Sequence, residues 1–233
     1  NLSRFFEISD RVFSWAGSRD EEEEWFRENG PDLPGLLQHL RDHGSAYDRV
    51  LFWCYRYAPS FFGLPLVRDR AILVPTAEED PAINLDVLGR YFTQPRGYLF
   101  LTPEERDLVR SRAEGPLPPS DIIGSGLDAI EARPDPAALD RLGLERPFAL
   151  YLGRVERNKG CETLLRMFEQ HLAGGGRRLP LVMAGPVLMP LPSHPLIRPL
   201  GFVDDAVREA LLAEARLLIV PSPYESLSLL ALE

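Results

Sequence analysis

Short apolar runs recur along the chain, separated by segments in which apolar and polar residues alternate with a helical period. The runs are rich in Val, Ile, Leu, Phe and Tyr, which is typical of strands buried on both faces of a parallel sheet. They predict strands at 48–54, 70–75, 98–101, 121–123, 148–152, 180–184, about 198–202 and 217–220.

The segments between these runs carry helix start signals. Thr102 and Glu105 have the spacing of a capping box and enclose Pro103, which suits the first helical position. Acidic residues follow Asp20, where the helix dipole favours them, and we expect their side chains to be solvated. The expected helices are 20–29, about 33–43, about 81–92, 103–112, about 136–142, 161–172, 204–215 and one from 226 onward.

This alternation of strands and helices predicts an α/β protein built from βαβ units. Residues 115–136 interrupt it with Gly and Pro around one short strand, which is typical of a domain boundary. We therefore expect two Rossmann-like, doubly wound domains, 1–125 and 126–233, facing each other across a cleft. The chain begins at Asn1 without an initiator Met and ends at Glu233 inside an expected helix, so we expect a fragment in which both domains are incomplete.

Composition and charge narrow the possible functions. Of the 233 residues, 45% are hydrophobic and 26% are charged, as in ordinary globular proteins. The formal net charge of −9 argues against broad nucleic-acid binding, and no apolar run approaches the roughly 20 residues that a membrane span needs. We expect a cytoplasmic protein with no nucleic-acid partner and no integral membrane segment.

The cysteines and histidines give little sign of a metal or disulfide site. Cys54 and Cys161 lie in or beside expected regular elements without a nearby partner, so buried free thiols are the better interpretation. His39 and His43 stand four residues apart on a helix face and could ligate a metal. Without a third ligand nearby, a solvated helix face is the better interpretation.

One loop concentrates candidate chemistry. Lys159 is the only lysine of the chain, and it lies with Arg154 in the loop 153–160, directly after an expected strand. Gly153 and Gly160 permit a tight strand-to-helix connection with close backbone approach, and the two cations suit a diphosphate. The alternative is a surface loop with incidental basic residues.

The last thirteen residues, PSPYESLSLLALE, form a second candidate segment. If Ser226 begins a helix, Glu225 and Glu233 lie roughly 12 Å apart along it at 1.5 Å per residue. The amides of Leu227, Ser228 and Leu229 would then be first-turn donors that suit an anion. Strand, turn, acid and helix start together predict a ligand crevice at the carboxyl end of a parallel strand.

These motifs resemble those of the donor-binding domain in retaining GT-B glycosyltransferases of family 4. The resemblance is carried by GRVERNKG at 153–160, MAG at 183–185, GFV at 201–203 and PSPYES followed by the E-x7-E spacing to Glu233. It includes GSGLD at 124–128, where the family joins its domains. It covers 121–233 through motifs and the N-terminal half only through the fold pattern.

The resemblance implies a role for each matched position. Arg154 and Lys159 hold the nucleotide diphosphate, and Glu225 meets hydroxyls of the donor sugar. Glu233 binds the nucleotide ribose, and the backbone around Phe202 and Val203 borders the base. Gly153 and the segment Ser226, Leu227 and Ser228 complete the implied substrate contacts. The family transfers without an obligatory metal, so no metal or other cofactor is expected, and the nucleotide sugar is a co-substrate.

Two positions depart from the family pattern. Ser228 replaces the glycine of the family's E-x-x-G, which puts the donor geometry in question. Glu78, in the loop PTAEEDP, stands where related enzymes commonly offer a histidine. A carboxylate can bind acceptor hydroxyls but, when ionised, cannot donate a hydrogen bond. A solvated acidic loop is the equally weighted alternative for Glu78.

The sequence therefore predicts a glycosyltransferase fragment of the kind used in polysaccharide biosynthesis. It would move a hexose-like sugar from a nucleotide diphosphate donor to a carbohydrate or lipid-linked acceptor with retention. A fragment with incomplete ends can fold and still lack turnover. The first alternative is a non-catalytic nucleotide-sugar-binding or scaffolding module. The second is another GT-B activity, such as a phosphorylase or an epimerase.

Overall fold

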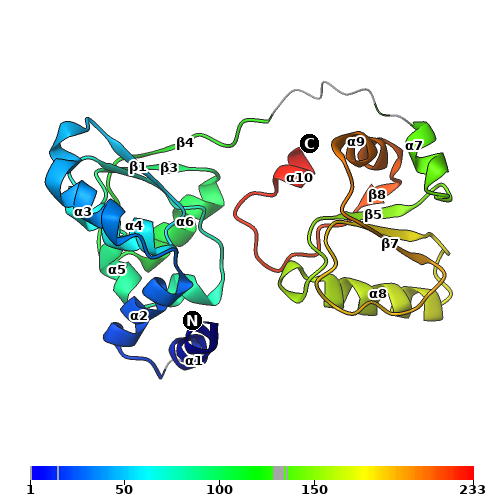
Figure 1. Ribbon diagram of the computed structural model, residues 1–233, viewed down its shortest axis with the longest axis horizontal. Coiled ribbons are helices and arrows are strands. Elements are labelled where there is room, and N and C mark those ends of the chain that lie inside the picture. Colours follow the sequence, from blue (N-terminus) through cyan, green and yellow to red (C-terminus); the bar gives the residue numbers. More distant parts are fainter. Residues whose placement is uncertain (1, 15, 128–133, 135) are drawn as a thin grey trace. The chain divides into compact units, whose positions relative to one another are not determined.

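The computed structural model describes residues 2–14, 16–127, 134 and 136–233, and it divides into two compact units. Unit 1 comprises Asn1–Gly126 together with Tyr224–Leu227, and unit 2 comprises Leu127–Pro223 together with Ser228–Glu233. Each unit is an α/β structure with its own parallel sheet (Figure 1). The predicted α/β class with two Rossmann-like domains is thereby confirmed, while their facing across a cleft stays a prediction.

The sheet of unit 1 has four parallel strands in the order β1-β2-β3-β4. Each strand lies within one residue of a predicted apolar run. Burial inside the sheet explains this best for β2 and β3, whereas the edge strand β4 is exposed along its whole length. The register pairs Phe52 with Leu73 and Trp53 with Val74. The strands are β1 (Val50–Trp53), β2 (Ala71–Val74), β3 (Gly97–Phe100) and β4 (Ser120–Ile122).

Two helices of unit 1, α1 and α4, were not predicted from the sequence. Spacing in α1 did carry a signal, since Phe5, Ile8 and Val12 recur at helical intervals and pack in the core. The α-helices are α1 (Leu2–Phe13), α2 (Arg19–Asn29), α3 (Pro34–His43), α4 (Ala58–Gly63), α5 (Val87–Tyr91) and α6 (Pro103–Arg112). Short 3₁₀ segments are η1 (Gly44–Ala46), η2 (Leu64–Val67) and η3 (Pro81–Asn84).

The predicted helix 81–92 is wrong as one element. It is divided into η3 and α5 by Leu85, whose φ of −67° and ψ of 135° are extended. Asp80 caps η3 by accepting a hydrogen bond from the Ile83 amide at 3.2 Å, and the 3₁₀ turn closes on Leu85. Asn84 and Asp86 favour caps and turns over helix interiors, which explains the break.

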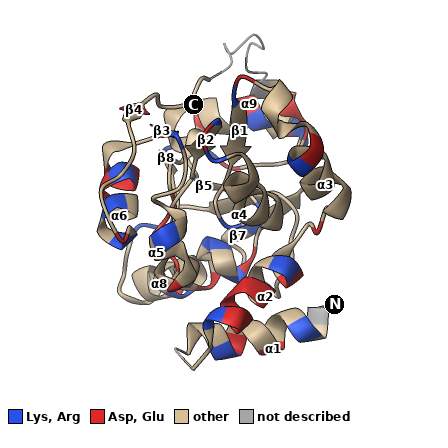
Figure 2. Ribbon diagram, turned by 90° about the vertical axis from the view of Figure 1, so that its left-hand side faces the viewer, with Lys and Arg blue, Asp and Glu red and all other residues tan. Residues whose placement is uncertain are grey.

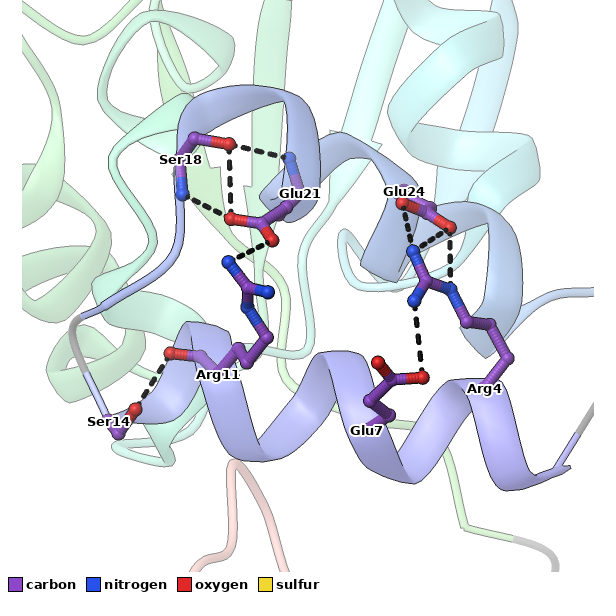
Figure 3. A network of polar contacts seen from close by, with 7 residues as sticks. All are labelled: Arg4, Glu7, Arg11, Ser14, Ser18, Glu21 and Glu24. Carbon is purple, nitrogen blue, oxygen red and sulfur yellow. Dashed lines mark hydrogen bonds and ion pairs between the residues drawn. The ribbon is translucent and has the colours of Figure 1, made fainter.

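The prediction that the acidic side chains of α2 are solvated is also wrong in part. Arg4 of α1 donates two hydrogen bonds of 2.9 Å to Glu24, and Arg11 pairs with Glu21 at 2.6 Å (Figure 3). Red and blue stretches accordingly lie along both α1 and α2 (Figure 2). Buried Glu22 accepts from the Val87 amide at 2.9 Å. The acidic run therefore joins α2 to α1 and to α5.

Unit 1 buries one face of its sheet much more completely than the other. Phe52, Leu73 and Phe100 point into the core that the helices share. On the opposite face of edge strand β1, Leu51 is 63% exposed and Trp53 is 62% exposed. In Figure 1 the helices of unit 1 gather on one side of the sheet.

Unit 2 is wound on both faces of its sheet. Helix α8 packs against the face that carries Tyr151 and Met183, whereas α7 and α9 pack against the face of Leu150 and Val182 (Figure 1). The parallel strands are β5 (Ala149–Leu152), β6 (Leu181–Ala184), β7 (Ile197–Gly201) and β8 (Leu217–Leu218), in the order β7-β6-β5-β8. The helical segments are α7 (Pro136–Arg141), η4 (Arg157–Lys159), α8 (Cys161–Ala173), α9 (Asp205–Glu214) and α10 (Leu229–Leu232).

Both cysteines are free thiols, as predicted. Cys161 is buried, but Cys54 is only partly buried, so that part of the prediction is wrong. Across the described ranges, no helix has the length and apolar character that crossing a membrane requires.

Candidate functional site

The strand order of unit 2 places a topological switch point at β5. From β5 the chain winds through α8 to β6 and then β7 on one side, and it returns through α9 to β8 on the other side of β5. Because α8 packs on one face of the sheet and α9 on the other, the chain reverses its direction of winding at β5. Such a topological switch point is where open α/β sheets bind ligands.

Three glycines hold the backbones close together at this edge. Gly160 (φ 73°) lies directly against the Pro221 carbonyl, and Gly185 (φ 134°) lies directly against the Gly153 carbonyl. A Cβ at either glycine would overlap these carbonyl groups, and both φ values disfavour other residues. The loop 153–160 is thereby packed against both the loop after β6 and the segment after β8.

Arg154 is held by its main chain while its side chain extends to solvent. Its carbonyl accepts a 2.6 Å hydrogen bond from the Tyr151 hydroxyl, and Cys161 Sγ lies 3.9 Å from the same oxygen. Burial, followed by the hydrogen bond with Cys161, raises the pKa of Tyr151, so this hydroxyl stays a donor. The side chain of Arg154 is 60% exposed, and its Nη2 lies 3.1 Å from a Glu156 carboxylate oxygen.

Lys159 ends the 3₁₀ turn η4, one residue before Gly160. Its side chain is half-buried, and its amide donates to the Glu156 carbonyl at 3.2 Å. Arg154 and Lys159 therefore stand at the two ends of one short loop at the switch point. Two cations at this position can receive the charge of a phosphate or diphosphate.

The predicted helix from Ser226 is wrong. Helix α10 begins at Leu229 and has four residues, so Glu225 and Glu233 do not lie on one helix and the 12 Å estimate does not apply. The amides of Leu227 and Ser228 are not part of its first turn. Ser228 is the residue before the helix, with an extended backbone that any residue can adopt. Serines favour such non-helical positions, which explains the late start.

The remaining predicted residues are distributed over both units. Phe202 follows β7, separated from β5 by β6, and is 83% exposed, whereas Val203 packs partly into the core. Glu233 forms an ion pair with Arg208 in the first turn of α9, which starts at this same edge. Glu225 is exposed and groups with unit 1, as do Ser226 and Leu227.

Glu78 lies at the carboxyl edge of the unit 1 sheet, within an ion-pair cluster. Its carboxylate is 3.4 Å from Arg56, which also pairs with buried Asp80 at 2.5 Å. Asp80 accepts a further hydrogen bond of 3.3 Å from the Tyr55 hydroxyl. The fully solvated alternative for Glu78 is therefore wrong, because its side chain is partly buried and paired.

The same edge of unit 1 has strained backbone that the sequence did not predict, and a buried acid, Glu105, that was predicted only as a capping residue. Cys54 (φ 63°) and Thr76 (φ 48°) follow the adjacent strands β1 and β2 in left-handed conformations. Buried Glu105 accepts from the Ala77 and Leu101 amides at 2.8 and 2.6 Å. Burial raises the pKa of Glu105, although these hydrogen bonds oppose the shift.

The histidine pair remains a helix-face feature. The rings of His39 and His43 lie 4.9 Å apart, and His39 Nε2 is 2.8 Å from the Tyr47 hydroxyl. Within the described ranges, no three His, Cys, Asp or Glu side chains gather in a way that could hold a metal ion.

Comparison with solved structures finds two matches of unequal strength. Sucrose-phosphate synthase from Thermosynechococcus elongatus matches with a TM-score of 0.63 and 17% identity, over 92% of this chain and 59% of that chain. AviGT4, a glycosyltransferase involved in avilamycin A biosynthesis, matches with a TM-score of 0.37 and 19% identity, over 88% of this chain and 50% of that chain. This chain thus spans less than two thirds of either structure. No protein-family model and no curated protein sequence matches it.

Proposed function

We propose that the chain binds a nucleotide diphosphate sugar at the switch point of unit 2. The proposed activity is transfer of the sugar, with retention, to a carbohydrate or lipid-linked acceptor. The observation that carries this proposal is the packing of the loop 153–160 against Pro221, which sets Arg154 and Lys159 at the carboxyl end of β5. The fold shared with sucrose-phosphate synthase agrees with it.

The chemistry of the donor explains why two cations are needed. When the bond between sugar and diphosphate breaks, negative charge develops on the departing phosphate. Preorganised cations stabilise that charge most where it appears, since they need not reorganise during the reaction. We propose that Arg154 and Lys159 supply this stabilisation without an obligatory metal.

The remaining contacts of the donor are assigned from the resemblance of the sequence motifs. We propose that Glu225 meets the sugar hydroxyls and Glu233 the ribose, for which Glu233 would share its carboxylate with Arg208. Phe202, which is 83% exposed, and Val203 would border the base. Exposed aromatic rings at such edges suit planar ligands. In unit 1, the partly buried Glu78 would bind acceptor hydroxyls.

Isothermal titration with UDP, GDP and ADP, and with the corresponding nucleotide glucoses, tests the phosphate site. Arg154→Ala and Lys159→Ala are each expected to weaken binding by about 10- to 100-fold, since each removes a charge-assisted hydrogen bond. Arg157→Ala is the matched control, because Arg157 lies in the same loop with its side chain 73% exposed and paired to Glu162. Equal affinity of all three variants and the wild-type chain would refute the assignment.

A binding module without transfer is the second candidate. It is favoured by the engagement of both Glu78 and Glu233 in ion pairs with arginines of this chain. The two functions are separated by measuring the release of nucleotide diphosphate from the bound donor in the presence of a panel of sugar acceptors. Tight donor binding without release for any acceptor would favour the module.

A further inference from the structure

The loop that carries Arg154 also carries an acid within contact of its guanidinium group. Glu156 Oε1 lies 3.1 Å from Arg154 Nη2. The two partners differ in burial, because the Glu156 side chain is 17% exposed and that of Arg154 is 60% exposed. Glu156 is therefore the fixed member of the pair, and Arg154 is the member that a ligand can reach.

The backbone around Glu156 is fixed on both sides. Before it, buried Val155 donates to the Pro186 carbonyl at 2.8 Å and accepts from the Leu188 amide at 2.9 Å. The Glu156 carbonyl itself accepts from the Lys159 and Cys161 amides at 3.2 and 3.4 Å. The backbone that carries the Glu156 side chain is thus fixed, and that side chain is only 17% exposed, which limits how far the carboxylate can move when an anion arrives.

We propose that Glu156 sets the charge selectivity of the donor site, favouring a nucleotide diphosphate sugar over the free nucleotide diphosphate. This inference rests on the proposed function, because it takes Arg154 as the diphosphate ligand. An ion pair through one guanidinium nitrogen leaves the other donors of Arg154 for the phosphates. The fixed carboxylate then repels whatever negative charge the ligand brings.

Donor and product differ in that charge. In the sugar nucleotide the terminal phosphate is esterified, whereas in the free diphosphate it can lose a second proton, with a pKa of about 6. The product therefore carries more negative charge than the donor near neutral pH, at the end closest to the departing sugar. Glu156 repels the product more strongly, which assists its release after transfer.

The test compares Glu156→Gln with the wild-type chain in titrations with UDP and UDP-glucose, or with the GDP or ADP pair if that base is bound. Glutamine keeps an oxygen acceptor for Arg154 and removes the charge. The variant is expected to bind the free diphosphate on the order of three- to tenfold more tightly, with a smaller gain for the sugar nucleotide. Added salt should reduce the difference.

Glu162→Gln is the matched control. It also removes one negative charge near the site, but the carboxylate removed pairs with Arg157 and not with Arg154. Thermal unfolding of both variants checks that they fold. In an Arg154→Gln background, the effect of Glu156→Gln should shrink, which supplies a second readout.

The outcomes separate this inference from the proposed function. If Lys159→Ala weakens binding but Glu156→Gln leaves it unchanged, the selectivity role of Glu156 is overturned and the proposed function is not. The same gain in Glu162→Gln as in Glu156→Gln also overturns it. Failure of the wild-type chain to bind any of the three nucleotide diphosphates or their sugars overturns the proposed function and this inference with it.

Discussion

Gly160 packs its α-carbon against the carbonyl group of Pro221, so that no side chain fits between them. This contact joins the loop after β5 to the segment after β8 across the switch point of unit 2. It also holds Lys159, the residue before Gly160, at the carboxyl end of the sheet.

Gly160→Ala should lower both stability and nucleotide affinity. A left-handed φ costs a non-glycine residue roughly 1–2 kcal/mol, and overlap with Pro221 adds to it. Gly175→Ala is the matched control, because Gly175 has a φ of 78° but open space around it. Thermal unfolding and titration with UDP should show a larger loss for Gly160→Ala, and similar losses would exclude a special role for the contact.

Tyr151→Phe should weaken nucleotide binding through the position of Arg154. It removes the 2.6 Å hydrogen bond to the Arg154 carbonyl and costs about 1 kcal/mol of stability. Tyr98→Phe removes an equally short bond to the Phe92 carbonyl in unit 1 and should lower stability without changing nucleotide affinity. Titrations on both variants check this, and identical affinities would contradict the positioning role of Tyr151.

Glu105→Ala should destabilise unit 1 by about 2–6 kcal/mol. The change leaves the buried Ala77 and Leu101 amides without their acceptor, and each lost partner costs roughly 1–3 kcal/mol. Glu104→Ala, at the exposed neighbouring position in the same helix turn, is expected to stay within about 0.5 kcal/mol of wild type. Denaturant unfolding monitored by circular dichroism measures both values, and equal midpoints would show that these bonds are dispensable.

The pairing of α1 with α2 should depend on pH through Glu21. The Ser18 amide is the main cause that lowers the pKa of Glu21 below 4.5, and Arg11 acts in the same direction. A carboxylate with a lowered pKa stabilises the folded state above its unfolded-state pKa and loses that contribution as the pH falls through the folded value. Glu21→Gln should therefore lower the unfolding temperature at pH 7, and the difference should vanish in strong acid.

Glu23→Gln serves as the comparison for that pH series. Glu23 occupies the same helix without the capping contact that Ser18 makes with Glu21. Its unfolding temperature should follow that of the wild-type chain across the series. A pH-independent effect of Glu21→Gln would show that geometry rather than charge matters at this cap.

The strands and the cationic loop could be predicted because their signals are local. A run such as Ala149–Leu152 is apolar on both faces, and only the interior of a parallel sheet accepts that pattern. Gly153, Gly160 and the two cations likewise stand within eight residues. In contrast, the resemblance that assigned the donor contacts depends on motifs spread over 121–233, and those roles remain predictions.

Helix limits near Glu225 and in 81–92 could not be predicted from local pattern. The segment after Ser226 has helix-favouring leucines, yet its helix starts at Leu229, and Leu85 breaks the other segment. Short helices gain most of their stability from tertiary packing, so propensity alone places their ends poorly. The start of α2 carried a signal that the sequence analysis did not use, because Ser18 and Glu21 have the spacing of a capping box.

The sequence by itself determined the α/β class, the positions of the strands along the chain and the residue types of the loop 153–160, because periodicity and glycine spacing are properties of neighbouring residues. Only the tertiary structure decided that Gly160 packs on Pro221 and that Tyr151 donates a hydrogen bond to the Arg154 carbonyl. It also decided that Glu156 pairs with the guanidinium group of Arg154. These relationships arise where loops from separate strands meet at one sheet edge. Their geometry depends on strand order, which no local pattern records.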